Sequence, residues 1–340
     1  MRILICSYVF RPSIGGIETV SKVLAEQFSS MGASVTVVTH TPGDGHVSGG
    51  YEVVRRPPVS KLRALAHKSD IILQSQISLH TLLPLLFCGK PIVIAHHVVW
   101  NRAGGIRGTW QQQLKRLVMP FCNNLAVSRA VAGSLPVKST VIGNPFEADE
   151  FTVDGETNRD KDIVFLGRLV DKKGCDVALR ALAILRNERL RPSFTVIGDG
   201  PEMPMLKRLS QELGIAGQVD FRGAMREERG REVARHKIMV IPSTYDEAFP
   251  LVAFEGLAAG CVLVAAEAGG LPEGVGPCGL LFPLSDAEAL AAALRRLLTE
   301  DGLRERLLGE RTAHLERFQP EKVARRYMGV FKSVLEKRRG

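Results

Sequence analysis

Short apolar, β-branched runs alternate with amphipathic helical patterns along almost the whole chain, and this alternation is the feature that most constrains its fold. It is typical of βαβ units, in which helices cover both faces of a parallel sheet. A representative helix is Gly16–Met31, in which Val20, Leu24 and Phe28 recur at helical spacing. The strands predicted in the first half are Arg2–Tyr8, Ser34–Thr39, Asp70–Gln74, Pro91–His96, Asn124–Val127 and Thr140–Ile142.

The alternation stops once and then resumes, which divides the chain in two. Residues 147–162 are polar and without periodicity, so we predict a connection there. The strands predicted after it are Ile163–Leu166, Ser193–Ile197, Gln218–Phe221, Ile238–Ile241 and Val262–Ala265. The Gly/Pro-rich stretch Gly269–Phe282 is expected to interrupt the second domain, which helices such as Asp286–Leu298 then close.

These patterns predict an α/β protein with two Rossmann-like, doubly wound domains that face a cleft. The length of 340 residues agrees with two domains. We place the first domain at residues 1–150 and the second at residues 160–318. Residues 319–340 form a basic amphipathic helix that either packs back on the first domain or meets a membrane surface.

Charge and composition restrict the class of partner. The chain has 45 Lys and Arg against 36 Asp and Glu, a net charge of +9 that suits nucleic acid, an anionic membrane surface or a phosphorylated ligand. Nucleic acid is disfavoured because aromatic residues are 6% of the chain and no helix-turn-helix or zinc pattern is present. The six cysteines lack metal-ligand spacing and are expected to be reduced thiols. No apolar run reaches the roughly 18 residues of a membrane span, so we expect a cytoplasmic protein, at most peripheral on the inner membrane face.

Two loops carry features suited to phosphate. Gly15-Gly16 stands between the first strand and a helix, where backbone N–H groups approach an anion, although such a turn can also be purely structural. Arg168 and Lys173 follow the strand Ile163–Leu166. There a guanidinium fork and an ammonium group can hold a diphosphate; the alternative is a solvated loop.

The richest segment runs from Ser243 to Gly260. Pro250 suits the first turn of a helix, which leaves the amides of Leu251 and Val252 free for a ligand. Glu255 would lie one turn further in, where a ribose diol could partner its carboxylate. If Glu247 and Glu255 share a helix, their separation of roughly 12 Å exceeds that of a glycosidase pair, so they would bind two parts of one ligand.

Taken together, these motifs resemble the retaining glycosyltransferases of the GT-B fold, family 4 (group 1). The resemblance rests on the E-x7-E pair Glu247 and Glu255, on Gly15-Gly16, on Gly167-Arg168 with Lys173-Gly174, and on Gly269-Gly270, in that family's order. It implies a hexosyltransferase that uses a nucleoside-diphosphate sugar. UDP- and GDP-sugars are the expected donors, and no cofactor or metal is expected.

The resemblance also implies roles for single residues. Arg168 and Lys173 would hold the diphosphate, with Gly16 approaching it from the first domain. Glu255 would bind the ribose and Glu247 the donor sugar, with backbone amides from Phe249 to Val252 (Phe249, Leu251 and Val252 among them) assisting. His97 matches a histidine near the transferred sugar, although the adjacent His96 is an alternative.

The chain departs from the family pattern at three places. Cys261 replaces a proline, Phe249-Pro250 replaces Phe-Gly, and His236-Lys237 stands where Ala-Asp is frequent. None of these departures removes a charged group of the donor site, so we expect the protein to be active. They leave open which donor sugar it would use.

The acceptor is a saccharide or a lipid-linked hydroxyl compound, expected in lipopolysaccharide, exopolysaccharide or glycolipid synthesis. Trp100, Arg102, Arg107 and Trp110 are the candidate acceptor residues, in a segment that could meet the bilayer or simply lead into a basic helix. A nucleotide-sugar epimerase or hydrolase and an enzyme acting on a soluble small molecule are the alternatives.

Overall fold

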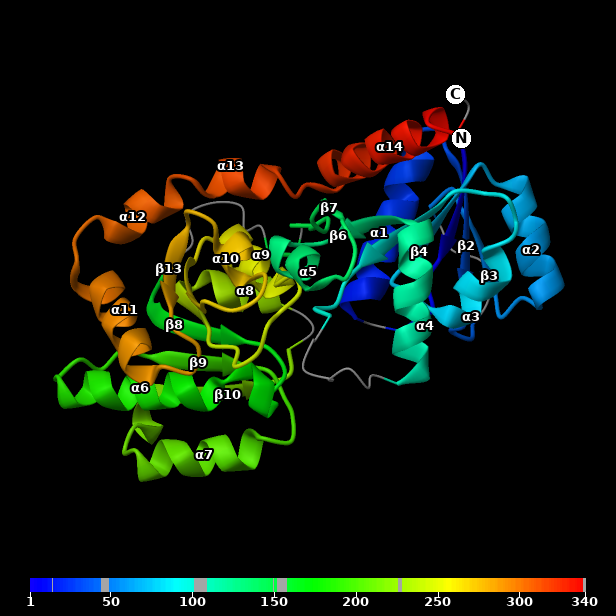
Figure 1. The fold of residues 1–340 in the computed structure, drawn as a ribbon. Coiled ribbons are helices and arrows are strands. Elements are labelled where there is room, and N and C mark those ends of the chain that lie inside the picture. Colours follow the sequence, from blue (N-terminus) through cyan, green and yellow to red (C-terminus); the bar gives the residue numbers. More distant parts are fainter. Residues whose placement is uncertain are drawn as a thin grey trace. The chain divides into compact units, whose positions relative to one another are not determined.

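The computed structural model describes residues 1–13, 15–43, 49–100, 109–148, 150–151, 158–225 and 228–338. Within them the chain forms two compact units, Met1–Phe146 with Phe318–Gly340 and Glu147–Arg317. Each unit is built on one parallel sheet (Figure 1). The prediction of two Rossmann-like sheets is therefore confirmed.

The first sheet has the strand order β3-β2-β1-β4-β5-β6-β7. Its strands are β1 (Arg2–Cys6), β2 (Ser34–Thr39), β3 (Glu52–Arg55), β4 (Ile71–Ser75), β5 (Ile92–His96), β6 (Asn123–Ala126) and β7 (Thr140–Val141). The helices of this unit are α1 (Gly16–Ser30), α2 (Val59–Lys68), α3 (Leu79–Leu82), η1 (Leu83–Leu85), α4 (Trp110–Val118), η2 (Met119–Phe121), α5 (Arg129–Ser134) and α14 (Pro320–Glu336).

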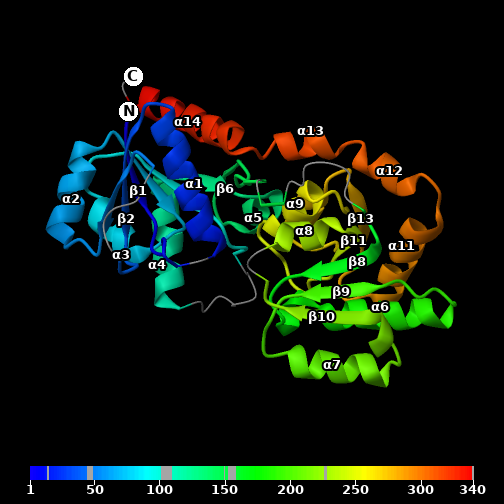
Figure 2. The ribbon, with the colours of Figure 1, turned by 180° about the vertical axis from the view of Figure 1, so that it is seen from behind.

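Alternate side chains of the first sheet enter opposite cores because successive strand residues point to opposite faces. Ile3 and Ile5 pack with α1 and α14, which lie side by side in the view from behind (Figure 2). The aromatic rings of Phe28, Tyr327 and Phe331 join these two helices. The C-terminal helix thus completes the core of the first unit. The opposite face carries α2, α3 and α4 (Figure 1).

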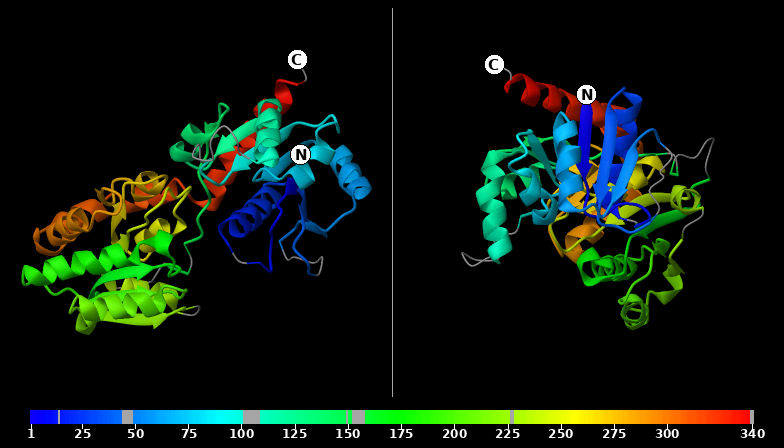
Figure 3. Two further views of the ribbon diagram at one scale, coloured as in Figure 1. Left: turned by 60° about the horizontal axis from the view of Figure 1, so that its bottom comes forward. Right: turned by 90° about the vertical axis from the view of Figure 1, so that its right-hand side faces the viewer.

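The second sheet has the order β10-β9-β8-β11-β12-β13. Its strands are β8 (Lys161–Leu166), β9 (Phe194–Ile197), β10 (Val219–Gly223), β11 (His236–Ile241), β12 (Val262–Ala266) and β13 (Gly279–Phe282). The helices are η3 (Asp171–Lys173), α6 (Cys175–Asn187), α7 (Met203–Glu212), η4 (Ala216–Gln218), α8 (Arg229–Ala234), α9 (Leu251–Ala258), α10 (Leu271–Val275), α11 (Ala287–Thr299), α12 (Leu303–Leu308) and α13 (Arg311–Glu316). Helices α6 and α11 pack side by side (Figure 3).

Three sequence expectations are wrong in part. Gly269–Phe282 does not interrupt the second domain, because it holds α10 and the edge strand β13, which pairs with β12. Strand β3, which pairs with β2, was not predicted. The polar stretch 147–162 is not wholly a connection, since Phe151 is buried in the second core and β8 begins at Lys161.

Two of the departures from the family pattern meet in one structural cluster. His236 Nε2 lies 2.8 Å from Thr195 Oγ1, and its Nδ1 lies 2.9 Å from the carbonyl oxygen of Glu232. The thiol of Cys261 donates to the carbonyl oxygen of His236. Lys237 pairs with Asp162 at 2.7 Å. These residues therefore join β8, β9 and β11 to α8. All six cysteines are free thiols.

Candidate functional site

The second sheet has its topological switch point between β8 and β11. The chain runs from β8 outward to β10 and then returns to β11, which pairs with β8 in parallel register. Loops that follow such neighbouring strands leave the same edge of a sheet and diverge, and ligands of open α/β sheets bind there. The loop after β8 carries Arg168 and Lys173, and the loop after β11 carries Ser243 to Pro250.

Two glycines, one after β8 and one after β12, let the loops that carry them lie against the loop after β11. Gly174 has φ +64°, and a Cβ there would overlap the carbonyl oxygen of Pro242. Gly269 has φ +56°, and a Cβ there would overlap the backbone of Glu247. Backbone hydrogen bonds complete the contact, from Thr244 to Lys172 at 2.9 Å and from Gly270 to Glu247 at 2.5 Å. Only glycine combines this left-handed backbone with such a close approach.

Lys173 and Glu247 meet at the centre of the site. Lys173 Nζ lies 2.7 Å from Glu247 Oε1, and Ser243 Oγ donates to the same oxygen. The side chain of Glu247 is 8% exposed and that of Lys173 is 25% exposed. Burial acts to lower the pKa of Lys173, but Glu247 and the nearby Tyr245 outweigh it, so this pKa lies above its ordinary value. The site thus holds a charged ammonium group on a buried carboxylate.

Glu255 is less fully paired than Glu247. Its carboxylate lies 3.8 Å from Arg229 Nη2, while the Arg229 guanidinium makes two hydrogen bonds to Glu150, at 2.9 and 3.1 Å, and covers the ring of Phe151. Burial raises the pKa of Glu255, Arg229 acts to lower it and Glu150 to raise it. A half-buried carboxylate with spare acceptor capacity suits a ligand that brings hydroxyl donors.

Glu247 and Glu255 do not share a helix, so the separation expected from helical spacing does not apply to them. Helix α9 begins at Leu251 with Pro250 as its N-cap, so Pro250 stands before the first turn and Glu247 lies in the preceding loop. The eight residues between Glu247 and Glu255 therefore do not measure a rise along one helix. Leu251 and Val252 are the first helical residues, so their N–H groups have no acceptor one turn back.

Arg168 and Phe249 occupy the periphery of the same loops. Arg168 is exposed, and among the residues that the structure describes no ion pair engages it. Phe249 stacks on Phe254 with ring centroids 5.1 Å apart, and His314 also stacks on Phe254, at 5.9 Å. These stacked rings connect the loop after β11 with α9 and α13.

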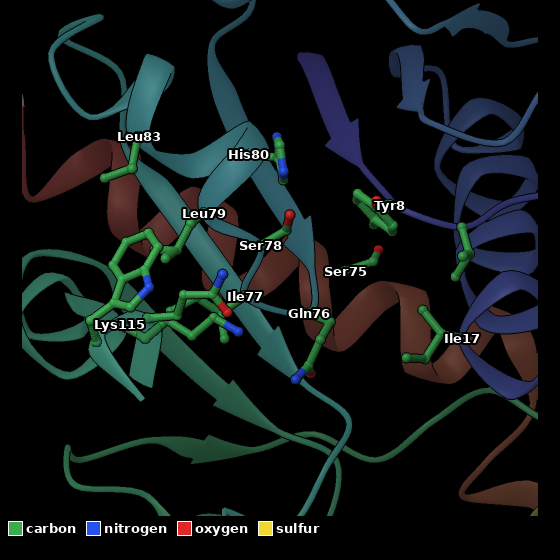
Figure 4. A pocket seen from close by; sticks show the side chains of 13 residues that line it. Tyr8, Ile17, Ser75, Gln76, Ile77, Ser78, Leu79, His80, Leu83 and Lys115 are labelled. Atoms are coloured by element: carbon green, nitrogen blue, oxygen red, sulfur yellow. The ribbon is translucent and has the colours of Figure 1, made fainter. Parts of the chain in front are cut away.

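The first sheet has its own switch point, between β1 and β4, and a cavity of about 500 Å³ opens there. Tyr8 and Ile17 line one side of it and Leu83 and Lys115 another, with Gln76 and the start of α3 between them (Figure 4). His40 stacks on Tyr8 with centroids 4.9 Å apart, and His80 lies 5.8 Å from His40. The cavity combines apolar walls with a few polar groups, as small-molecule sites do.

The structure separates the two candidate histidines. His96 ends β5 and is buried, with Nε2 2.9 Å from Asn124 Oδ1. His97 follows the strand and is half-buried, and its backbone N–H donates to Gln76 Oε1 at 2.8 Å. Burial, with His96 as a smaller cause, lowers the pKa of His97 to about 4. His97 is thus a neutral imidazole near pH 7, and it is more exposed than His96.

The remaining predicted residues lie in the first unit. Gly15 is the N-cap of α1 in extended conformation and Gly16 its first residue, and the carboxylate of Glu18 lies against Gly15. Trp100 is half-buried, whereas Trp110 is 69% exposed and lines the cavity. Arg102 and Arg107 lie outside the described residues.

Sequence reasoning missed four residues of these sites. Ser243 and Tyr245 contact the Lys173–Glu247 pair, Arg229 lies beside Glu255, and Gln76 lines the cavity with φ +92°. The position of Ser243 and Gln76 in the sequence could have marked them as site residues. Both stand just past the carboxyl end of a strand at a switch point. No local pattern marks Arg229.

Within the described ranges, no helix is long and apolar enough to cross a bilayer. The same residues contain no group of three or more His, Cys, Asp or Glu side chains that could hold a metal ion.

The sequence of the second unit is similar to known glycosyltransferases. Residues 147–312 match the family described as Glycosyl transferases group 1. A D-inositol 3-phosphate glycosyltransferase of Acidothermus cellulolyticus is 36% identical over 188 residues, which cover 52% of this chain and 42% of that protein. An exopolysaccharide phosphotransferase of Streptomyces coelicolor is 34% identical over 183 residues, covering 52% of this chain and 19% of that protein. The match therefore spans less than half the length of these relatives.

Solved structures share the fold of the whole chain. The Anabaena protein HepE in complex with UDP has a TM-score of 0.80 at 20% identity, and the match covers 98% of this chain and 100% of that one. Sucrose-phosphate synthase of Thermosynechococcus elongatus has a TM-score of 0.74 at 19% identity, with 99% of both chains covered. Identities this low support the fold alone, which is the GT-B fold.

Proposed function

We propose that the chain is a retaining glycosyltransferase, since residues 147–312 match the group 1 glycosyl transferases and the chain has the GT-B fold. It moves a hexose from a nucleoside-diphosphate sugar to an acceptor hydroxyl. The observation that carries the proposal is the ion pair of Lys173 and Glu247 at the switch point of the second sheet. This pair places an ammonium group for a diphosphate beside a carboxylate for sugar hydroxyls.

Arg168 and Lys173 act on the leaving diphosphate. Negative charge accumulates there as the glycosidic bond breaks, so the two cations and the first amides of α9 stabilise the transition state more than the ground state. Loss of one such group is expected to slow transfer by about 10²- to 10³-fold, as for an oxyanion-hole donor. The exposed position of Arg168 leaves its guanidinium available for this contact.

Glu255 binds the ribose and Glu247 the donor sugar. Glu255 keeps spare acceptor capacity because its nearest cation, Arg229, is engaged by Glu150. UDP and GDP are the proposed nucleotides. Support for UDP comes from the similarity to HepE, which was solved with UDP and with UDP-glucose.

We assign no carboxylate nucleophile, so the acceptor attacks from the face that the leaving group vacates. The leaving phosphate takes the acceptor's proton, and the configuration at the anomeric carbon is retained. His97, as a neutral imidazole, contributes a hydrogen bond to the sugar rather than a charge. Transfer needs no divalent ion in this scheme and should survive EDTA.

The acceptor site is the cavity of the first unit, at the switch point of its own sheet. Trp110 and Lys115 give it an aromatic wall and a cation that suit a saccharide carrying an anionic or lipid group. We propose a cytoplasmic enzyme of lipopolysaccharide, exopolysaccharide or glycolipid synthesis. The similarity to an exopolysaccharide phosphotransferase supports this class of pathway.

Ligand-induced thermal shift is the first test. UDP, GDP, ADP and TDP and their sugars are compared, since a ligand that binds the folded chain raises its unfolding temperature. We expect one nucleotide to stand out, and its effect to vanish in Arg168→Ala and Glu255→Ala. Normal sugar transfer by both variants would refute the site.

The same donor incubated without acceptor separates the alternatives. Rapid isomerisation or cleavage would identify an epimerase or hydrolase, whereas a transferase leaves most of the donor intact. Once an acceptor is found, the anomeric configuration of the product, read by NMR, tests retention.

A further inference from the structure

A long part of the first unit is almost free of acidic residues. Between Glu52 and Glu147 the sequence has twelve Lys and Arg but one acidic residue, Asp70. Asp70 is paired with Arg2 at 2.7 Å. This stretch alone carries more net positive charge than the whole chain, so the charge is concentrated in one unit.

The most exposed large apolar side chains lie in the same stretch. Phe87 is 91% exposed, Phe121 85%, Trp110 69% and Leu117 68%. Monomeric proteins rarely expose large apolar side chains in a cluster unless a partner covers them. Trp110, Leu117 and Phe121 are seven and four residues apart along α4 and η2, so they follow one side of the helix.

The elements that carry these residues are neighbours. Arg63 on α2 donates to the carbonyl oxygen of Pro84 on η1 at 3.2 Å. Leu83 on η1 lines the cavity together with Trp110 on α4. Leu86, next to Phe87, lines a second hollow together with Phe121. Lys61 on α2 and Arg116 on α4 add exposed cations.

We infer that this basic-apolar face, made by α2, η1, α4 and η2, docks on an anionic phospholipid bilayer. Lysine and arginine side chains meet the lipid phosphates, while Phe87, Leu117 and Phe121 enter the interface between headgroups and acyl chains. Two observations select this occupant. A second copy would bring two positive faces together, and nucleic acid offers no apolar phase for Leu117 and two phenylalanines.

The docking face shares Leu83 and Trp110 with the cavity of the first unit. An acceptor anchored in the bilayer would therefore reach the cavity from the membrane surface. This last step rests on the proposed function, whereas docking itself does not require it.

Vesicle flotation without donor or acceptor tests the docking alone. The protein is mixed with vesicles of phosphatidylcholine or of phosphatidylcholine with an equal part of phosphatidylglycerol. We expect flotation only with the anionic vesicles, and less of it when salt rises from about 0.1 to 0.5 M. Tryptophan emission should shift to the blue with anionic vesicles, also in Trp100→Phe, because Trp110 is the exposed one of the two tryptophans.

Paired variants locate the surface. Phe87→Ser/Phe121→Ser and Lys61→Ser/Arg116→Ser should each weaken vesicle binding by about tenfold or more. Controls of equal chemistry on the second unit, Leu281→Ser/Leu284→Ser and Arg180→Ser/Arg208→Ser, should bind like the parent protein. The unfolding temperature and the nucleotide-induced shift should stay unchanged in the surface variants, which separates failure of docking from failure of the donor site.

Two results would overturn the inference. One is equal or absent flotation of the parent protein with both kinds of vesicle. The other is a dimer in solution that Phe87→Ser/Phe121→Ser dissociates, since a second copy would then cover the face.

Discussion

Lys173 Nζ lies 2.7 Å from Glu247 Oε1, although the two residues are 74 positions apart in the chain. The pairing exists because β8 and β11 are neighbours in the sheet and their loops leave the same edge. It gives a buried carboxylate a cationic partner in the absence of a ligand. A diphosphate that binds Lys173 would compete for the same ammonium group.

Removing Lys173 should destabilise the second unit more than removing Glu247. Lys173→Met leaves the buried Glu247 carboxylate with Ser243 and should cost about 2–3 kcal/mol in unfolding free energy. Glu247→Gln should cost less, because Lys173 is the more exposed partner. In urea denaturation the double variant should lose less than the two single variants together.

Lys172→Met is the matched control for this pair. Lys172 is exposed and stands over the same Tyr245 ring as Lys173, at 5.7 Å. Its loss should change stability by no more than about 0.5 kcal/mol. If Lys172→Met and Lys173→Met changed the free energy of unfolding equally, the ion pair would contribute nothing to stability.

Glu255→Gln should stabilise the protein and weaken its nucleotide binding. Burial raises the pKa of Glu255, so the folded state holds its proton more tightly than the unfolded state. Stability from this group is therefore lost as pH rises above the ordinary glutamate value of 4.5, and the uncharged glutamine avoids that loss. The gain in unfolding temperature should be present at neutral pH and vanish in acid.

Nucleotide affinity of the same variant should fall about tenfold or more, since a hydrogen-bonded charge is lost from the ribose contact. Isothermal titration at neutral pH measures this. Unchanged affinity would remove Glu255 from the site, while a lower unfolding temperature would contradict its description as a destabilising, half-buried charge.

Gly269→Ala should disrupt the donor loop. A Cβ there would overlap the backbone of Glu247, at a φ that disfavours side chains, so the loop after β11 must move. We expect a loss of about 2–4 kcal/mol in stability and loss of the nucleotide-induced thermal shift. Gly329→Ala is the control: this exposed glycine inside α14 has open space around it, so alanine should stabilise by about 0.5–1 kcal/mol.

The protein should lose stability in mild acid, in part through His236. Burial lowers the pKa of His236 to about 4 from 6.5, so between these values the unfolded chain binds a proton that the folded chain does not. Stability is then lost as pH falls, by about 2 kcal/mol between pH 7 and pH 5 for this group alone. Urea denaturation at both pH values should give a smaller difference in His236→Gln than in His67→Gln, where an exposed histidine is replaced.

Much of the candidate site followed from position in the sequence. Arg168, Lys173 and Glu247 could be chosen because each follows a strand, and parallel strands present their carboxyl ends at one edge. The pairing of Lys173 with Glu247, and the approach of Arg229 to Glu255, could not be chosen. They depend on which loops lie against each other, and that depends on glycines whose partners are tens of residues away.

The sequence by itself determined the alternation of strands and helices, because the periodicity of apolar residues acts locally, within each element. Only the tertiary structure decided the short edge strands β3 and β13, since four residues carry too little local signal and pairing with β2 and β12 stabilises them. It also decided that α2, η1, α4 and η2 share one face. Segments apart in sequence acquire a common surface only when a sheet sets them side by side, and the cations and exposed aromatic rings then act together.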